Sequence, residues 1–385
     1  MDFEFSEEQQ IVRRSIASFM KKECTPEYVR WCDENAEFPQ KTWKGIVEMG
    51  LLGASIPEEY GGTGGDIVDQ VVILEELTKG MTAVGFAYFL SSCFGGKSIG
   101  FYGSEEQKKF YLKGLAEGRF RVALGLTEPG GGTDILNSLK TKAILKDGKY
   151  IVNGQKVFIT GAQNADYIIT VVRTGESKKK THGLSILIIK ADSPGLTIRR
   201  IDTMGLRSIG TNEIFFEDVV VPAENILGRK DNGWYHLLST LNNERITAAA
   251  LSVGMSQAAL DYALQYVKER EAFGRPIGQF QAVQHKLANA AKEIELSRLI
   301  TYKAAWLQSK GQTCHIEAAM AKLAASEACW NVADIGMQVM GGYGFSMEYD
   351  MQRFYRDASP GRAVPINNEM ILNLIGEGLG LPKCY

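Results

Sequence analysis

The stretch that decides the fold is residues 149–160, which reads KYIVNGQKVFIT. β-Branched and aromatic residues, which favour strands, stand on both sides of Asn153-Gly154, a dipeptide typical of the tight turn in a two-stranded hairpin. We therefore predict antiparallel strands at residues 149–152 and 156–160, joined by that turn. Runs of the same texture add strands at Tyr167 to Val172, Leu184 to Ile189 and Ile214 to Val221.

Helical patterns flank this β-region on both sides. On the N-terminal side, Ser6 and Gln9 fit a capping box, and helical signals continue to about residue 120. On the other side, long helical periodicities follow Trp234, and they place Ile294, Leu296, Leu299 and Ile300 toward a core. An α, β, α order without βαβ alternation predicts an α+β protein. The domains expected are 1–120 (helical), 121–230 (β) and 231–385 (helical bundle).

Length, composition and charge limit the classes of protein. With 385 residues, 45% of them hydrophobic, the chain is typical of a globular protein of two or three domains. A net charge of −2 predicts no nucleic-acid partner. The chain contains no run of about 18 apolar residues, so we expect no membrane insertion. The dispersed histidines predict no metal. A cytoplasmic protein is favoured by the acidic N-terminus and by cysteines without CxxC spacing, namely Cys24, Cys32, Cys93, Cys314, Cys329 and Cys384.

Residues 126–134, LTEPGGGTD, combine closely spaced glycines with hydroxyl and acidic side chains. Glycines let backbone N–H groups approach a planar ring rich in acceptors, although a plain surface turn is the alternative. The stretch is similar to the Thr-Glu-Pro-Gly-x-Gly-Ser-Asp motif of acyl-CoA dehydrogenases, which the chain resembles over nearly its whole length. The resemblance implies an N-terminal helical domain, a central antiparallel β-domain and a C-terminal four-helix bundle. It also implies FAD, an acyl-CoA substrate, an electron-transferring flavoprotein as partner, and a homotetramer.

The resemblance also assigns residues to the cofactor. Phe158 stands where the family has a tryptophan that shields the flavin, although a place in the strand core is the alternative. Arg270 begins a motif similar to Arg-x-x-Phe-Gly…Gln, whose arginine pairs with the flavin pyrophosphate across a subunit boundary; alone it could equally be a solvated helix cap. The implied cofactor-binding residues are Leu126, Thr127, Phe158, Thr160, Arg270, Phe273, Gln281, Gln338, Gly341, Gly342, Asn367 and Glu369.

One position departs from the family pattern. The family has a glutamate nine residues after the arginine of Arg-Asp-Ala, and that glutamate removes a proton from the carbon next to the thioester. Here the motif starts at Arg356, and Pro365 stands in the glutamate's place. Proline also lacks the N–H that would help to hold the thioester oxygen. The reaction therefore needs another base or is a different reaction.

Glu244 is the candidate base. It lies in Leu241-Asn242-Asn243-Glu244-Arg245, and it matches the position from which isovaleryl-type members draw their catalytic glutamate. An apolar pocket would raise the pKa of this carboxyl group, whereas a salt bridge with Arg245 would make its role structural. Glu369, one helical turn beyond Pro365, is a weaker candidate. The expected substrate contacts are Ser91, Thr133, Asn242, Arg245 and Pro365.

Three readings of the function follow. The first is α,β-desaturation of an acyl-CoA with electrons passed to an electron-transferring flavoprotein. The second is an enoyl-CoA reductase, since Arg362 and Glu369-Met370 resemble the pattern of crotonobetainyl-CoA reductase-like members, or a dehydrogenase of cyclic alkenyl-CoA esters. The third is a catalytically silent CoA-binding flavoprotein. Two glycine patterns, in residues 91–98 and 342–344, are incomplete as nucleotide-binding motifs.

Overall fold

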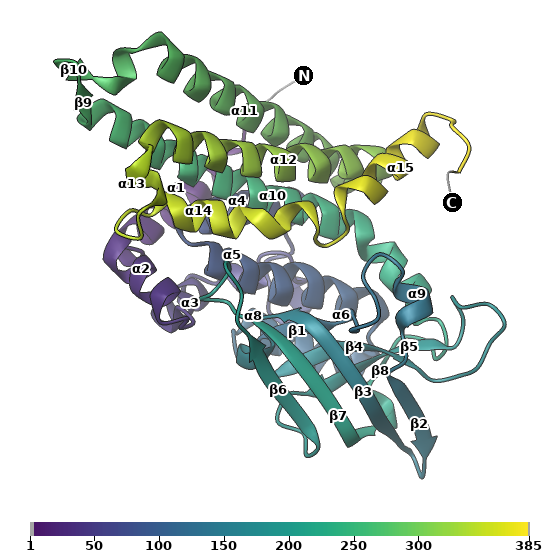
Figure 1. Cartoon of the computed structure of the whole chain (residues 1–385). Coiled ribbons are helices and arrows are strands. Elements are labelled where there is room, and N and C mark those ends of the chain that lie inside the picture. Colours follow the sequence, from purple (N-terminus) through teal and green to yellow (C-terminus); the bar gives the residue numbers. More distant parts are fainter. Residues whose placement is uncertain (1–3, 384–385) are drawn as a thin grey trace.

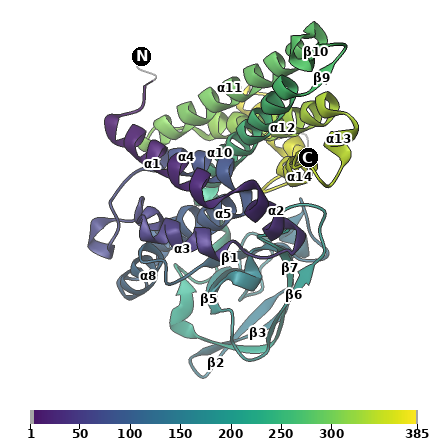
Figure 2. The same ribbon diagram turned by 90° about the vertical axis from the view of Figure 1, so that its left-hand side faces the viewer.

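The computed structural model describes residues 4–383, which form helices, then a β-sheet, then long helices. Figure 1 shows the long C-terminal helices on one side of the molecule and the sheet on the other. Figure 2 shows N-terminal helices between these two parts. The predicted α+β class and the three-part architecture are confirmed.

The N-terminal part is helical, as its capping signals predict. The Ser6 hydroxyl accepts a hydrogen bond from the Gln9 N–H at 3.1 Å, and the Gln9 side chain accepts one from the Ser6 N–H at 3.3 Å. This capping box starts the first helix. The helices are α1 (Glu7–Glu23), α2 (Pro26–Glu34), α3 (Gln40–Glu48), α4 (Ile67–Gly80), α5 (Thr82–Tyr88), α6 (Lys97–Tyr102), α7 (Glu105–Gln107) and α8 (Lys113–Ala116), with π-helical segments Phe89–Gly96 and Lys108–Leu112.

The sheet has the order β6-β7-β3-β2-β4-β5-β8, with β1 added beside β4. Its pairs are antiparallel, as predicted, except that β4 runs parallel to β1 and to one residue of β2. The elements are β1 (Val122–Gly125), α9 (Ile135–Ser138), β2 (Lys142–Lys146), β3 (Lys149–Thr160), β4 (Tyr167–Arg173), β5 (Leu184–Lys190), β6 (Leu196–Ile201), β7 (Thr211–Pro222) and β8 (Ile226–Leu227).

The predicted hairpin turn at Asn153-Gly154 is wrong, because β3 runs through it without a turn. The register against β7 shifts there, so the pair forms a β-bulge. The Asn153 side chain closes the bulge by exchanging two hydrogen bonds of 2.9 Å with Asp218 on β7. The tight turn lies earlier, at Asp147-Gly148, where φ is 49° and 73°. Both residues have the left-handed conformation that a two-residue hairpin requires.

The C-terminal part is built on three long helices, of which α10 packs against α4 as well as α12. Leu296 and Leu299, which periodicity places in the core, are 58% and 44% exposed, whereas Ile294 is buried. The period identified the helix correctly but not its buried face. The elements are α10 (Gly233–Glu269), β9 (Glu271–Ala272), β10 (Arg275–Pro276), α11 (Gln281–Ser309), α12 (His315–Met340), α13 (Gly342–Phe345), α14 (Met351–Ala358) and α15 (Asn368–Gly378).

Residues 4–383 contain no helix long and apolar enough to cross a membrane, and no cluster of three or more His, Cys, Asp or Glu placed to hold a metal. The cysteines within this range are all free. Cys384 and the first three residues of the N-terminal stretch lie outside the described residues.

Candidate active site

Glu244 lies in the N-terminal half of α10 and is only 9% exposed. The π-helical segment Phe89–Gly96 packs across it, and Phe89, Cys93 and Phe94 form one wall of a narrow hollow beside the carboxylate. The Asn243 side chain fixes this wall by donating a hydrogen bond to the Cys93 carbonyl at 3.2 Å. Local π-helices are frequent at functional sites, because their wider turn moves side chains off the regular helical register.

The surroundings of Glu244 change its acidity. Burial in this apolar environment raises the pKa of Glu244 to about 7, and the nearby charge of Arg245 opposes the shift without cancelling it. Within residues 4–383 the carboxylate forms no hydrogen bond or ion pair, so the salt bridge with Arg245 weighed from the sequence is not present. The Arg245 guanidinium instead donates to the Asn242 side chain at 3.4 Å. Glu244 is therefore a buried carboxyl group without a fixed partner.

The loop of residues 126–134 is anchored by a buried ion pair. Lys156, fully buried on β3, donates to the Glu128 carboxylate at 2.8 Å and to the Leu126 carbonyl at 3.1 Å. The Glu128 oxygens also accept the N–H groups of Lys140 and Thr141, at 2.7 and 3.0 Å. Burial alone would raise the pKa of Glu128, but these partners outweigh it and leave the pKa below its usual value. This pair holds the loop's path between β1 and β3.

The anchored loop has free donors on the side away from the ion pair. Among the described residues, the backbone N–H groups of Leu126 and Thr127 find no acceptor, while the Thr127 carbonyl accepts the Val157 N–H at 2.9 Å. Next to them on β3, Phe158 is 64% exposed and has φ +58°, so it is not a strand-core residue. Free N–H donors beside an exposed ring suit a planar heterocycle with acceptor atoms, and Thr160 lies at the same strand end. This part of the chain fits a flavin.

The segment that carries the vacated base position lies close to this loop. The Asn367 side chain donates to the Thr133 hydroxyl at 2.9 Å. Pro365 and Glu369 are exposed. Arg362 does not pair with a carboxylate within the described chain, and its guanidinium stacks 4.2 Å above the Trp330 ring. The exposed position of Glu369 contrasts with the buried position of Glu244.

Six of the predicted cofactor residues lie elsewhere. Figure 1 shows β9, β10 and α13 at the end of the long helices that is farthest from the sheet. Here the Arg270 guanidinium lies 5.2 Å from the Tyr343 ring, and Phe273 is 94% exposed. Within residues 4–383, Arg270 forms no ion pair and remains available to an anion. One chain therefore does not bring the two halves of the predicted cofactor site together; the distant half comprises Arg270, Phe273, Gln281, Gln338, Gly341 and Gly342.

Ser91, one of the predicted substrate contacts, is 2% exposed. Its hydroxyl accepts a hydrogen bond from the Val122 N–H at 3.2 Å and so joins the π-helical segment to β1. Sequence reasoning missed the partners that anchor the site, Lys156 and Lys322. Lys322 stands in an otherwise apolar stretch and Lys156 directly precedes one, and burial lowers the pKa of each to about 8. A lone polar residue on an apolar face was the only signal available.

Comparison with known proteins gives consistent results. Three family models match in chain order: the acyl-CoA dehydrogenase N-terminal domain at residues 6–119, the middle domain at 123–219 and the C-terminal domain at 231–380. A probable acyl-CoA dehydrogenase of Bacillus subtilis (strain 168) is 44% identical over 93% of this chain and 94% of its own. The CarC subunit of the caffeyl-CoA reductase–Etf complex of Acetobacterium woodii is 37% identical over 92% and 93%. The structure of butyryl-CoA dehydrogenase from Megasphaera elsdenii superimposes with a TM-score of 0.94, at 35% identity over 99% of this chain and 100% of that one.

Proposed function

The chain belongs to the acyl-CoA dehydrogenase family of FAD-dependent oxidoreductases, which act on CH–CH bonds of acyl-CoA thioesters, and we propose that it desaturates an acyl-CoA with Glu244 as the base. The observation that carries the proposal is the environment of Glu244, which is buried and whose carboxylate has no fixed partner among residues 4–383. A general base works best when its pKa lies near the working pH and when it is not held in an ion pair that stabilises its charged form. Glu244 meets both conditions, whereas Pro365 has no ionisable group.

In the proposed step, Glu244 takes a proton from the carbon next to the thioester. When bound, FAD supplies the acceptor for the hydride that leaves the neighbouring carbon. The apolar wall of Phe89, Cys93 and Phe94 limits the contact of the carboxylate with water, and this desolvation raises its basicity. Because Pro365 has no N–H, the thioester oxygen must find its donors outside the vacated position.

The cofactor would be held by residues already described. The free N–H groups of Leu126 and Thr127 would bind the edge of the isoalloxazine, and the exposed ring of Phe158 would cover one part of it. The strained backbone of Phe158 supports this role, because a non-glycine residue with positive φ costs energy and is often retained for function. Thr160 lies at the same strand end, and Asn367 supports this half of the site by donating to the Thr133 hydroxyl.

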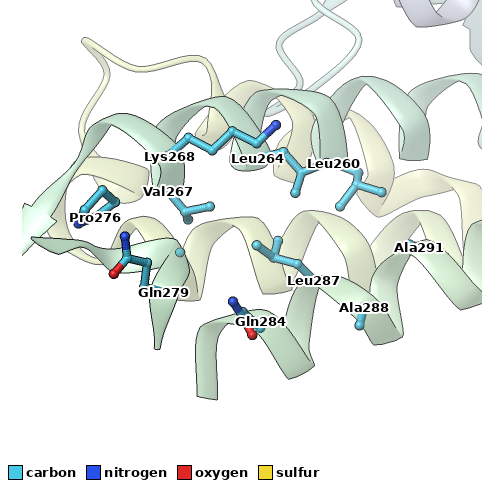
Figure 3. A pocket seen from close by; sticks show the side chains of 11 residues that line it. Leu260, Leu264, Val267, Lys268, Pro276, Gln279, Gln284, Leu287, Ala288 and Ala291 are labelled. Carbon is cyan, nitrogen blue, oxygen red and sulfur yellow. The ribbon is translucent and has the colours of Figure 1, made fainter. Parts of the chain in front are cut away.

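The second half of the cofactor site supports an oligomer, and we propose a homotetramer. Arg270 directly precedes β9 and Gly341 directly precedes α13. Figure 1 shows β9 and α13 at the end of the long helices farthest from the sheet, so a neighbouring subunit would supply both residues. At the same end, α10 and α11 border an open hollow of about 530 Å³ in which Leu264, Val267 and Leu287 face one another (Figure 3). An open hollow lined mainly by apolar side chains favours a subunit contact. A subunit contact would also explain why Leu296 and Leu299 on α11 are exposed in the single chain.

An electron-transferring flavoprotein is the proposed redox partner, since the caffeyl-CoA reductase relative is named as part of a complex with one. That relative also favours a second candidate, enoyl-CoA reduction. A pKa of about 7 leaves Glu244 half-protonated at neutral pH, so it could equally donate a proton to Cα while Cβ receives the hydride. We also propose a cytoplasmic location, which the free cysteines support.

One experiment separates these functions. The FAD-loaded enzyme is mixed without oxygen with saturated, conjugated and alicyclic acyl-CoA esters, and the loss of visible flavin absorbance is followed. Rapid bleaching by saturated esters supports desaturation. Reoxidation of the chemically reduced enzyme by a conjugated enoyl-CoA, without bleaching by saturated esters, supports the reductase. No response to any thioester would contradict both and leave a silent CoA-binding flavoprotein.

A further inference from the structure

The buried lysine of α12 lies at the base of the segment that follows Pro365. Lys322 is 1% exposed, and its ammonium donates to the Ile366 carbonyl at 2.6 Å and to the Asn368 side chain at 2.7 Å. Ser326, one turn later on α12, donates to the same Asn368 oxygen at 3.1 Å. A buried lysine is costly unless its donors are satisfied, so these bonds fix the position of residues 366–368 against α12.

Asn367 connects the segment held by Lys322 to the β-domain. Asn367 lies between the two residues held by Lys322. Its side-chain oxygen accepts the Met370 N–H at 3.0 Å, which caps α15, and its nitrogen donates to the Thr133 hydroxyl at 2.9 Å. The cap fixes the rotamer of the Asn367 amide, because only one orientation places the oxygen on the helix end and the nitrogen on Thr133.

The bond to Asn367 also decides what Thr133 can do. A hydroxyl has one donor and two acceptor lone pairs. Since the oxygen of Thr133 accepts from Asn367, its single O–H remains available to donate to a ligand. Thr133 is exposed, and the preceding residues of its loop are anchored at Glu128 by Lys156. The glycine-rich residues 130–132 between these two fixed points have few other constraints.

We propose that Lys322 and Asn367 form a latch that holds residues 126–134 over the cofactor and orients the Thr133 hydroxyl as a donor to the bound thioester or flavin. Lys322 and Asn367 are positioning residues in this proposal, and Thr133 is the group that contacts ligand. The proposal rests on the proposed function for the identity of that ligand. The hold of the latch on residues 126–134 does not depend on the proposed function.

Amide hydrogen exchange of the FAD-loaded enzyme tests the latch. Asn367→Ala should speed exchange in residues 126–134 about 3- to 10-fold, the range expected for losing one hydrogen bond, and should speed FAD release similarly. Lys322→Met should have the larger effect and should extend it to residues 364–370. Asn373→Ala is the matched control, because this asparagine lies on α15 and, within residues 4–383, its side chain hydrogen-bonds to Met370 and not to Thr133. Unchanged exchange in residues 126–134 of Asn367→Ala would overturn the latch.

Substitutions at Thr133 test the donor assignment. Thr133→Ser keeps the hydroxyl and should preserve the KM for acyl-CoA, whereas Thr133→Val should raise it about 3- to 10-fold. Asn367→Asp offers an acceptor in place of the amide donor, so it should draw the Thr133 O–H away from ligand and match Thr133→Val. Equal KM values in all three variants would contradict the assignment. If the parent enzyme responds to no acyl-CoA, the proposed function fails, while loop exchange in Asn367→Ala still decides the latch.

Discussion

Two buried glutamates of this chain show how a partner decides the role of a carboxylate. Glu244 and Glu128 are 9% and 6% exposed. Glu128 accepts from Lys156 and from two backbone N–H groups, and its pKa is lowered. Glu244 has no such partner among the described residues, and burial raises its pKa to about 7. The first carboxylate is fixed as a structural anion, and the second is free to exchange a proton near neutral pH.

The largest difference should appear when Glu244 loses its charge. Glu244→Gln keeps the size of the side chain but cannot take a proton, so the rate of flavin reduction by substrate should fall about 10²- to 10⁴-fold. Stopped-flow absorbance of the FAD-loaded variant gives this rate, and its FAD content serves as the control. A rate close to that of the parent would remove Glu244 from the chemistry.

Glu128→Gln should act on stability instead. It leaves the Lys156 ammonium buried without its counter-charge, and breaking a buried ion pair in this way costs about 3–5 kcal/mol. We expect a lower urea midpoint and reduced FAD content, because the path of residues 126–134 depends on the pair. The double variant Glu128→Gln/Lys156→Met removes both charges and should recover part of the loss. Equal stability of Glu128→Gln and the parent would mean that the pair does not anchor the loop.

The pH dependence of stability should reveal the raised pKa of Glu244. The folded pKa of Glu244, about 7, lies above its ordinary value of 4.5, so ionisation disfavours the folded state. The stability that the neutral carboxyl group of Glu244 contributes is fully present below pH 4.5 and is lost as the pH rises through about 7. Relative to the parent, Glu244→Gln should therefore gain up to about 3 kcal/mol between these limits. Urea unfolding at several pH values measures this gain, and a constant difference would refute the shift.

Activity should follow the same titration. A base must be ionised, so kcat/KM for desaturation should fall about tenfold per pH unit below about 7 and level off above it. For the reverse reaction the acid form is needed, and kcat/KM for reduction should fall as pH rises. A profile without a break between pH 6 and 8, at unchanged FAD content, would be inconsistent with Glu244 in either role.

The smallest effect is expected at a third carboxylate. Glu369 is exposed in the first turn of α15, so Glu369→Gln should change kcat/KM less than about threefold, as most exposed substitutions do. The same assay as for Glu244→Gln applies. A loss comparable to that of Glu244→Gln would indicate that the base lies in the segment after Pro365 and not on α10.

Local signals predicted part of this structure well. The capping box at Ser6 and the strands after Tyr167 depend on neighbours in sequence, and both are present. Asn153-Gly154 misled because the same dipeptide suits a bulge, and only the pairing with Asp218 on β7 decides between them. Leu296 and Leu299 follow a helical period, but a period does not tell which partner covers that face.

The family pattern singled out Glu244 and Phe158, and their roles remain predictions; the structure shows the first buried on α10 and the second exposed on β3. The pattern could not reveal that Glu244 has no ion pair in the part of the chain that the structure describes, because Arg245 is its neighbour in sequence yet donates to Asn242. Lys156 and Lys322 were out of reach for a further reason. Each holds a segment at least 28 residues away in sequence, at Glu128 and at Ile366, and such distant contacts leave no local pattern.

The central claim is that Glu244 removes the proton next to the thioester carbonyl. The most direct measurement is hydrogen exchange at that carbon: the FAD-loaded enzyme is incubated with an acyl-CoA in D₂O, and deuterium in the recovered thioester is measured by mass spectrometry. The parent enzyme should incorporate deuterium at Cα, and Glu244→Gln, with thioester binding verified, should not. Incorporation by Glu244→Gln at the rate of the parent would contradict the account.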